Sequence, residues 1–176
     1  MSDSKPADTE RQIENMKAVV DVAKAMARFI KVDDLLIFIV GETTKVMDAD
    51  RSSLFLFDGK TNELWSKIAQ GVDLMEIRFP VGQGIAGDVA ATRTGSNIPD
   101  AYDDSRFNQE FDKKTGYRTK SVLCLPIINA EDQLTGVIQV PNKKDDGAFD
   151  EQDAELLSAL GAKMEGHPVT VLATID

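Results

Sequence analysis

The feature that most constrains the fold of this chain is the order of two hydrophobic patterns. Segments with helical periodicity occupy both ends of the sequence, and short apolar segments typical of strands occupy the middle. The predicted strands are residues 53–57, 64–69, 75–79, 122–128 and 134–140. This order predicts an α+β fold, in which a central antiparallel sheet has the N- and C-terminal helices on one face and a loop-rich cover on the other.

The first predicted helix spans residues 10–31 and carries two apolar rows. One row has the spacing of a coiled-coil seam and consists of Ile13, Met16, Val20, Ala23, Ala27 and Ile30. The second row lies beside it and consists of Val19, Val22, Met26 and Phe29. Two rows favour two partners, the helix's own domain and a second helix, although a single wide core face would give the same pattern. Residues 1–9 are polar, contain Pro6 and are expected to be disordered.

Further helices are expected in three places around the strands. They are residues 32–47, a helix from the glycine-rich segment 82–87 to about residue 93, and residues 149–164. A short helix is expected at residues 108–114, whereas residues 97–106 are expected to be irregular.

Charge and rare residue types exclude several classes of function. The chain has 176 residues, 30 of them acidic and 20 basic, for a formal net charge of −10. Affinity for nucleic acid comes mainly from lysine and arginine, so no nucleic-acid partner is expected. One cysteine, Cys124, and one histidine, His167, provide neither a disulfide nor the usual zinc site or catalytic triad. We therefore expect no enzymatic activity and no metal.

No segment has the pattern of a signal peptide or a membrane span. Charged residues such as Lys17, Asp21 and Arg28 interrupt the first apolar stretch. The expected location is the cytoplasm, where Cys124 would stay reduced, and no membrane partner is expected. Cys124 lies within an apolar strand, which indicates a core residue.

Four segments of the sequence resemble a GAF domain, a module that senses small molecules. They are residues 52–58, residues 79–87 (FPVGQGIAG), residues 97–102 (NIPDAY), and residues 115–119 together with 123–126. The chain most resembles the cyclic-nucleotide-binding GAF domains of phosphodiesterases and bacterial adenylyl cyclases. The resemblance covers a GAF domain at residues 32–164. The coiled-coil spacing before it predicts a dimerisation or signalling helix at residues 10–31, and a C-terminal tail follows at 165–176.

Those domains carry a signature of Asn-Lys, Phe and Asp-Glu. This chain matches it with Asn142, Lys143, Phe149 and Asp153, and replaces the final Glu with Ala154. The resemblance implies an ion pair between Lys143 and Asp153 beneath the ligand pocket. If desolvated, the pair holds the last strand to the last helix, and breaking one half costs about 3–5 kcal/mol. On the surface, the same pair would be worth about 0–1 kcal/mol.

The resemblance also implies which residues contact a cyclic nucleotide. The candidates are Ser53, Ala69, Gln70, Ile85, Ala86, Asn108, Asp112, Thr115, Thr119 and Gln139. Ser53 would lie near the base, Ile85 and Ala86 near the ribose and phosphate, and Gln139 on the pocket floor. The four candidates between residues 108 and 119 would form a lid over the ligand.

Several of these assignments leave alternatives open. Relatives of the cGMP-binding type often have an aromatic residue followed by an acid where this chain has Ala69 and Gln70, so stacking on the base is weakened. Asp112 could lie on a solvated helix, and Thr115 and Thr119 could serve in caps or turns. Gln139 is harder to explain by structure alone, because a buried amide needs hydrogen-bond partners.

The glycine-rich segment 84–87 is a candidate anion site. At the start of a helix, free backbone amides and the helix dipole favour a phosphate, so an acidic chain could bind a monoanion there. A glycine-rich turn can also simply make room for the backbone.

The resulting hypothesis is a regulatory GAF domain with a small-molecule ligand, cAMP or cGMP, and no covalent cofactor. It would relay lid closure to its terminal helices in a homodimer, and an output domain or a partner protein in trans would receive the signal. The alternative is a dimerisation scaffold that has lost nucleotide binding or senses another small ligand. Residues 169–175 of the tail have a strand-like apolar pattern.

Overall fold

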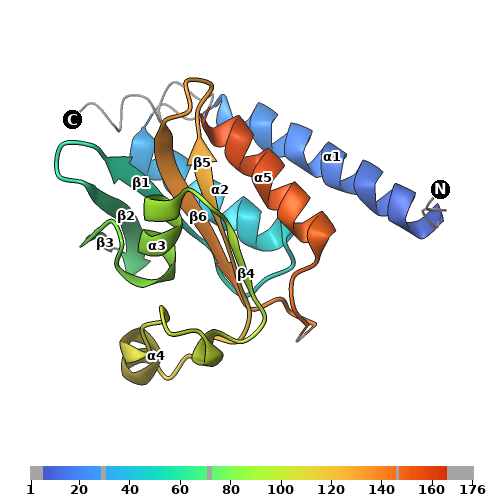
Figure 1. The fold of residues 1–176 in the computed structure, drawn as a ribbon. Coiled ribbons are helices and arrows are strands. Elements are labelled where there is room, and N and C mark those ends of the chain that lie inside the picture. The colour runs from blue at the N-terminus through green and yellow to red at the C-terminus, as the bar shows by residue number, and fades with distance from the viewer. Residues whose placement is uncertain (1–5, 29–30, 71–72, 146, 166–176) are drawn as a thin grey trace.

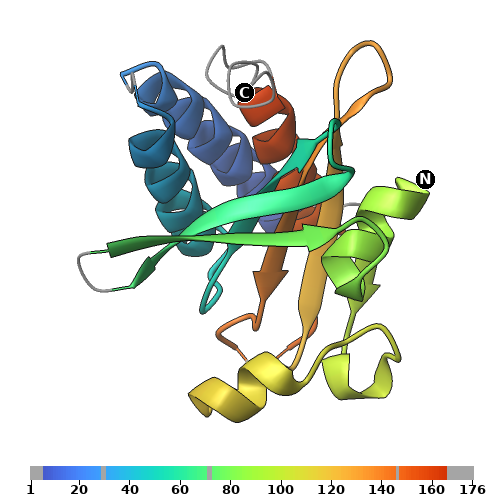
Figure 2. The ribbon, with the colours of Figure 1, turned by 90° about the vertical axis from the view of Figure 1, so that its left-hand side faces the viewer.

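The computed structural model describes residues 6–28, 31–70, 73–145 and 147–165. Six strands form one antiparallel sheet in the order β3-β2-β1-β6-β5-β4, with helices on both faces (Figures 1 and 2). The strands are β1 (Ser53–Asp58), β2 (Glu63–Gln70), β3 (Asp73–Pro80), β4 (Ser96–Ile98), β5 (Val122–Ile128) and β6 (Leu134–Pro141). The helices are α1 (Pro6–Met26), α2 (Val32–Val46), α3 (Gly84–Thr92), η1 (Ala101–Asp103), α4 (Glu110–Thr115) and α5 (Glu151–Glu165). The predicted α+β architecture is confirmed.

The sheet separates two hydrophobic clusters, because successive side chains of a strand point to opposite faces. In β1, Leu54 and Leu56 belong to the cluster beneath the terminal helices, whereas Phe55 belongs to the cluster beneath α3. We call these the terminal-helix core and the α3 core. The largest fully buried residues of the terminal-helix core are Met26, Leu35, Ile39, Met47, Leu54, Leu123, Ile138, Leu157, Leu160 and Met164. The α3 core includes Phe55, Leu64, Ile85, Ala86, Val89, Cys124 and Val137.

Helix α1 begins earlier and ends earlier than predicted. It starts at Pro6, so residues 6–9 are helical rather than disordered, and it ends at Met26. Proline is well suited to the first position of a helix, since its missing N–H would have no intrahelical partner there. Asp8 lies in the first turn and favours the positive end of the helix dipole.

The two apolar rows of α1 have different environments. Val19, Val22 and Met26 of the second row are buried in the terminal-helix core. In the row with coiled-coil spacing, Ile13 is 49% exposed, Met16 70% and Val20 47%. Of the remaining row members, Ala23 is half-buried and Ala27 exposed, while Ile30 and Phe29 lie outside the described residues. The core therefore uses the second row and leaves much of the first uncovered.

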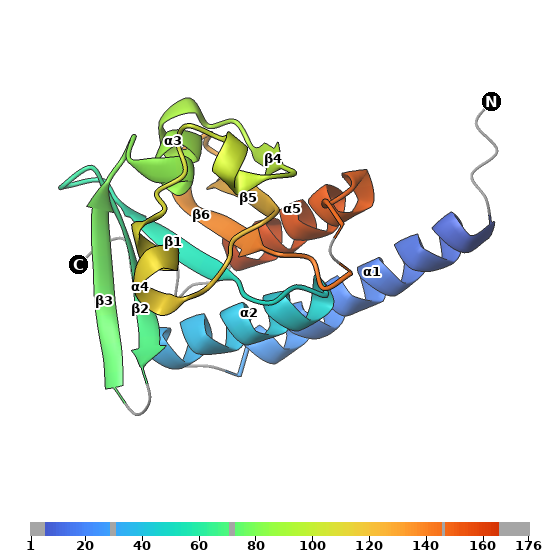
Figure 3. The same ribbon diagram turned by 90° about the horizontal axis from the view of Figure 1, so that it is seen from below.

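Helices α1 and α5 pack side by side and run in the same direction (Figure 1). Arg11, near the start of α1, contacts Asp150, just before the start of α5. At the other end, Met26 and Met164 are both buried in the terminal-helix core. The pair covers one face of the sheet together with α2 (Figure 3).

The other side of the sheet carries α3 and the segment from β4 to α4. Strand β4 overlaps the start of the region predicted to be irregular, residues 97–106. It has three residues and pairs Ser96 with Cys124 of β5. Its brevity hid it from the sequence pattern. Figures 1 and 2 show α4 beyond the end of the sheet at which β5 begins and β6 ends. The loop-rich cover is thus present, with a short helix at its tip.

Candidate functional site

A row of polar side chains crosses the α3 side of the sheet. Ser53 of β1 pairs with Gln139 of β6, Gln139 pairs with Cys124 of β5, and Cys124 pairs with Ser96 of β4. Strand alternation places Ser53 with Phe55, and Gln139 with Val137, on the face of the α3 core. Ser53 and Gln139 are each half-buried. The fold therefore brings two of the candidate residues together as neighbours on one surface.

The start of α3 lies against the same face. Ile85 and Ala86 are buried in the α3 core, so their side chains are used for packing. Gly82 and Gly84 have φ of +97° and +71°, the left-handed region that glycine adopts without strain. The backbone amides in the first turn of a helix have no intrahelical partner. The segment is thus both a tight turn and a helix start with amides available to an acceptor.

Close packing of the glycine-rich turn depends on Gly87. A Cβ at this position would lie 3.1 Å from the backbone N and C of Gly82 and 3.2 Å from the carbonyl oxygen of Pro80. The Gly82 amide donates to the Gly87 carbonyl at 2.8 Å, which closes the turn onto the first turn of α3. The turn can therefore approach the helix only because residue 87 has no side chain.

Asp112 of α4 is the centre of a buried cluster rather than a solvated residue. Its residue exposure is 5%, and its carboxylate accepts hydrogen bonds from the Tyr102 hydroxyl (2.7 Å), the Thr119 amide (2.8 Å) and the Thr119 hydroxyl (2.9 Å). The hydrogen bond to Asp112 raises the pKa of Tyr102. Asp112 and Thr119 are therefore brought together, and they hold the two sides of the lid segment to each other.

The other two lid candidates make local hydrogen bonds. The Asn108 side-chain oxygen accepts from the Glu110 amide at 3.0 Å, at the start of α4. The Thr115 hydroxyl accepts from the Tyr117 amide at 3.3 Å, at the end of the helix. Both residues are exposed, so this conformation uses them in a cap and a turn.

Ala69 and Gln70 lie at the end of β2. They pair with Leu74 and Asp73 of β3, so they belong to the hairpin at one edge of the sheet. The described part of the structure does not extend to their side chains.

The signature residues connect the loop after β6 to its surroundings. The Lys143 ammonium lies 2.7 Å from the Asp153 carboxylate, and the two side chains are only 15% and 5% exposed. Of the two alternatives for this pair, the structure shows the desolvated one. Asn142 has a φ of +56°, which asparagine tolerates better than most residues. Phe149 is buried in the terminal-helix core.

Arg11 of α1 adds a second cation to this ion pair. Its guanidinium contacts Asp150 at 2.7 Å and Asp153 at 2.9 Å. The hydrogen bond from Arg11 is the largest cause that lowers the pKa of Asp150 to about 2. The sequence pattern did not reveal this contact, because more than 130 residues separate Arg11 from either acid.

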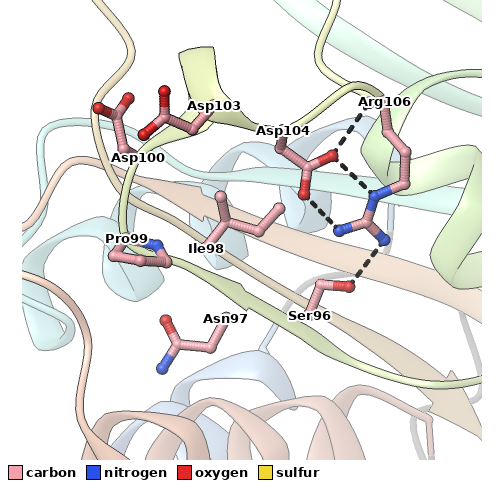
Figure 4. A pocket seen from close by; sticks show the side chains of 8 residues that line it. All are labelled: Ser96, Asn97, Ile98, Pro99, Asp100, Asp103, Asp104 and Arg106. Carbon is pink, nitrogen blue, oxygen red and sulfur yellow. Dashed lines mark hydrogen bonds and ion pairs between the residues drawn. The ribbon is translucent and has the colours of Figure 1, made fainter.

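An open pocket of about 360 Å³ lies at β4 and η1, beside the polar row (Figure 4). Asp100, Asp103 and Asp104 line it together with Arg106. Arg106 is bound by Asp104, by Asp88 on α3 and by the Ser96 hydroxyl, and its contact with Asp104 lowers the pKa of that carboxyl to about 2. An acidic rim around a neutralised arginine is unfavourable for an anion, so this pocket is a poor candidate for a phosphate site.

The single cysteine is buried, and no metal-binding cluster occurs among the described residues. Cys124 is fully buried, and burial raises the pKa of its thiol well above the usual range. Within residues 6–28, 31–70, 73–145 and 147–165, no group of three or more His, Cys, Asp or Glu side chains is arranged to hold a metal ion. Across the same residues, no helix has the length and hydropathy needed to span a membrane.

The fold is that of a GAF domain. The profile of the GAF domain family matches residues 31–166, most of the chain. The chain therefore belongs to the GAF domain family, as the sequence resemblance indicated.

Curated relatives of the chain include cyclic-nucleotide phosphodiesterases. A probable 3′,5′-cyclic phosphodiesterase of Caenorhabditis elegans is 38% identical over 159 residues, which cover 83% of this chain and 21% of that protein. A dual 3′,5′-cyclic-AMP and -GMP phosphodiesterase of Takifugu rubripes is 44% identical over 124 residues, covering 64% of this chain and 14% of that protein. The chain thus spans about a fifth or less of the length of these relatives.

Solved structures share the fold at lower identity. The GAF domain of an Acinetobacter phosphoenolpyruvate-protein phosphotransferase has a TM-score of 0.72 and 19% identity, covering 91% of this chain and 94% of that one. The free methionine-R-sulfoxide reductase of Neisseria meningitidis has a TM-score of 0.72 and 17% identity, covering 98% and 96%. At these identities the likeness shows the fold alone.

Proposed function

We propose that this chain is a regulatory GAF domain that binds a cyclic nucleotide, cAMP or cGMP, on the α3 side of its sheet. The observation that carries the proposal is the adjacency of Ser53 and Gln139 on that face. Both are half-buried polar residues next to an apolar core, where an unpaired amide is costly. A flat, polar-edged base would satisfy the Gln139 amide, which can both donate and accept hydrogen bonds.

The start of α3 supplies the second half of the proposed site. The first-turn amides from Gly84 to Ala86 and the positive end of the helix dipole favour a single phosphate charge. This arrangement overcomes the net charge of −10, because the amides act at short range whereas exposed charges are screened within about 10 Å. The names of the relatives, phosphodiesterases of cyclic AMP and cyclic GMP, support the same ligand class.

The lid would close over the ligand through Asp112, Thr119 and their neighbours. The three donors on the Asp112 carboxylate hold the segment as one unit. Asn108, which is exposed on the same segment, could exchange its local hydrogen bond with the Glu110 amide for a ligand, and the exposed Thr115 lies at the other end of α4. Closure would then reach the terminal helices of a homodimer, whose uncovered α1 row is formed by Ile13, Met16 and Val20.

Isothermal titration of ligand-free protein with cAMP and with cGMP tests the ligand. We expect saturable heat with at least one of them, and at 100 times the dissociation constant the ligand should stabilise the protein by about 2.7 kcal/mol. Gln139→Leu should weaken binding, whereas Gln12→Leu, a matched change at an exposed position of α1, should not. An equal effect of the two variants would contradict the assignment of Gln139 to the site.

The second candidate function is a dimerisation scaffold that binds no nucleotide or senses another small ligand. The exposure of Ile13, Met16 and Val20 favours this alternative, because it provides a dimer surface that needs no ligand. The small Ala69, which cannot stack on a base, favours it as well. No heat with either nucleotide, in a protein that still dimerises, would select the scaffold.

A further inference from the structure

A chain of polar contacts runs from the lid to helix α1. It begins at Asp112, which binds the amide and the hydroxyl of Thr119. The residues on either side of Thr119 are both held by one side chain: Asn142 donates to the Arg118 carbonyl at 2.8 Å and accepts from the Lys120 amide at 2.6 Å. The position of the lid is therefore tied to the loop after β6.

The same loop continues the contacts to the terminal helices. Lys143, the next residue after Asn142, binds Asp153 of α5 at 2.7 Å. Asp153 uses its other carboxylate oxygen to accept from the Arg11 guanidinium at 2.9 Å, and Arg11 also binds Asp150. Arg11 thus joins α1 to the chain of contacts at the start of α5.

Four members of this chain of contacts are buried, whereas the side chains of Lys143 and Arg11 are 15% and 36% exposed. Asp112 is 5% exposed, Thr119 7%, Asn142 7% and Asp153 3%. A buried polar network tolerates few arrangements, because each unsatisfied group is costly. A shift at one member therefore changes the fit of the next, and contiguous hydrogen-bond and ion-pair networks of this kind are one route by which coupling between distant sites is carried.

We propose that this polar network couples the state of the α4 lid to helix α1, and that Arg11 is the positioning residue that completes it. The proposal deepens the proposed function, since a nucleotide that moves the lid would be its natural input. The coupling itself is a property of the described side chains, and it exists whether or not a nucleotide binds.

Hydrogen exchange with a loosened lid tests the coupling without a ligand. Thr119→Val removes one donor to Asp112 and keeps the shape of the side chain. In the full chain we expect exchange of the α1 amides at residues 12–20 to rise about threefold or more, relative to the α2 amides at residues 39–46. In the Arg11→Gln background, where α1 has lost its contacts to both acids, Thr119→Val should add nothing further.

Lys17→Gln is the matched control background, because it removes the same charge from an exposed position of the same helix. In the Lys17→Gln background, Thr119→Val should raise the exchange of the α1 amides by the full amount. In an Arg11→Lys background it should raise this exchange in part, because a lysine can reach one of the two carboxylates. If the α1 response is equal in the Arg11→Gln and Lys17→Gln backgrounds, Arg11 does not carry the coupling and the proposal is overturned. Unchanged α1 exchange in the wild-type background overturns it as well.

A second variant covers the case in which Thr119→Val fails to fold. Tyr102→Phe removes the hydroxyl that donates to Asp112 at 2.7 Å, from a residue that is only half-buried. Its effect on exchange of the α1 amides is likewise compared in the Arg11→Gln and Lys17→Gln backgrounds. If neither nucleotide binds but α1 exchange still responds to the lid variants through Arg11, only the proposed ligand is rejected. If a nucleotide binds but α1 exchange does not respond through Arg11, only the role of Arg11 is rejected.

Discussion

At the scale of single residues, Asp153 shows how a buried carboxylate becomes tolerable. It accepts hydrogen bonds from Lys143, from Arg11 and from the Asp150 amide, so both of its oxygens are satisfied. Burying a charge without such partners is strongly unfavourable. The stability of this junction should therefore depend on each donor.

Lys143→Met should lower the free energy of unfolding by about 1–3 kcal/mol, because it leaves a buried acceptor with one donor fewer. Arg11 keeps the loss below that of a fully orphaned charge. Urea denaturation measures the change. Lys144→Met, at the exposed neighbouring residue, should change it by less than about 0.5 kcal/mol. Equal losses would show that the Lys143–Asp153 contact contributes no more than a surface charge.

The Asp104–Arg106 pair predicts an acid-dependent loss of stability. Arg106 lowers the pKa of Asp104 from 3.8 to about 2 in the folded protein. A depressed folded-state pKa gives stabilisation that is fully present above the unfolded-state value and is lost as the pH falls from about 4 to about 2. Asp104→Asn should therefore reduce the dependence of stability on pH in this window, measured by thermal unfolding at each pH. A variant with the wild-type dependence would contradict the prediction, and Asp103→Asn at an exposed neighbour serves as control.

The sequence predicts contacts between residues that share a known pattern and misses those that do not. The family signature predicts the ion pair between Lys143 and Asp153, because both residues belong to it. Arg11, Tyr102 and Arg106 were not singled out, because their partners are chosen by the way distant elements pack. Arg11, for instance, meets Asp153 only after α1 has docked on α5.

At the scale of elements, the turn before α3 depends on the absence of a side chain at Gly87. Its backbone neighbours at 3.1 Å cannot move without moving the turn. Gly87→Ala should therefore destabilise the protein by about 1–3 kcal/mol and weaken any anion binding at the start of α3.

Gly41→Ala in α2 is the matched substitution. A Cβ there would meet nothing within 4 Å, so the variant should gain about 0.5–1 kcal/mol from its higher helix propensity. Thermal unfolding of the two variants checks the predicted loss of stability in Gly87→Ala and the predicted gain in Gly41→Ala. A neutral or stabilising Gly87→Ala would show that the turn can relax.

Elements with a clear period or a clear stop signal were predictable, including the short helix α4, expected at residues 108–114 and observed at Glu110–Thr115, whereas strand β4 was not. The strands β5 and β6 are strongly apolar and were found close to their observed bounds. Strand β4 was not predicted, because three residues are too few to show a hydrophobic period. Its position is set by its pairing with β5. The start of α1 was missed because residues 6–9 are polar and carry no apolar period, although proline suits the first turn of a helix.

At the scale of the whole molecule, the uncovered row of α1 predicts self-association. Met16→Lys places a charge in the centre of the row and should shift the protein from dimer to monomer in sedimentation velocity. Gln12→Lys adds the same charge at an exposed polar position of α1 and should leave the mass unchanged. The row is not a dimer surface if the wild type is a monomer or if both variants keep the dimer.

The arrangement of the whole site could be predicted only in part. The family pattern placed Ser53, Gln139 and the start of α3 around one face, and pairing makes Ser53 and Gln139 neighbours. It did not indicate that the Asp112 carboxylate would be occupied by the lid's own donors. Such competition between internal and ligand hydrogen bonds depends on three-dimensional packing, which spacing along the chain does not encode.

The shared direction of α1 and α5 sets how this domain would behave as a link in a longer protein. The described chain starts at the beginning of one helix and finishes at the end of the other, and the 15 residues of α5 correspond to roughly 22 Å. Pro6 and Glu165 therefore lie toward opposite ends of this pair of parallel helices. A rotation or an axial displacement of α1 would then be passed across the length of the domain to the end of α5.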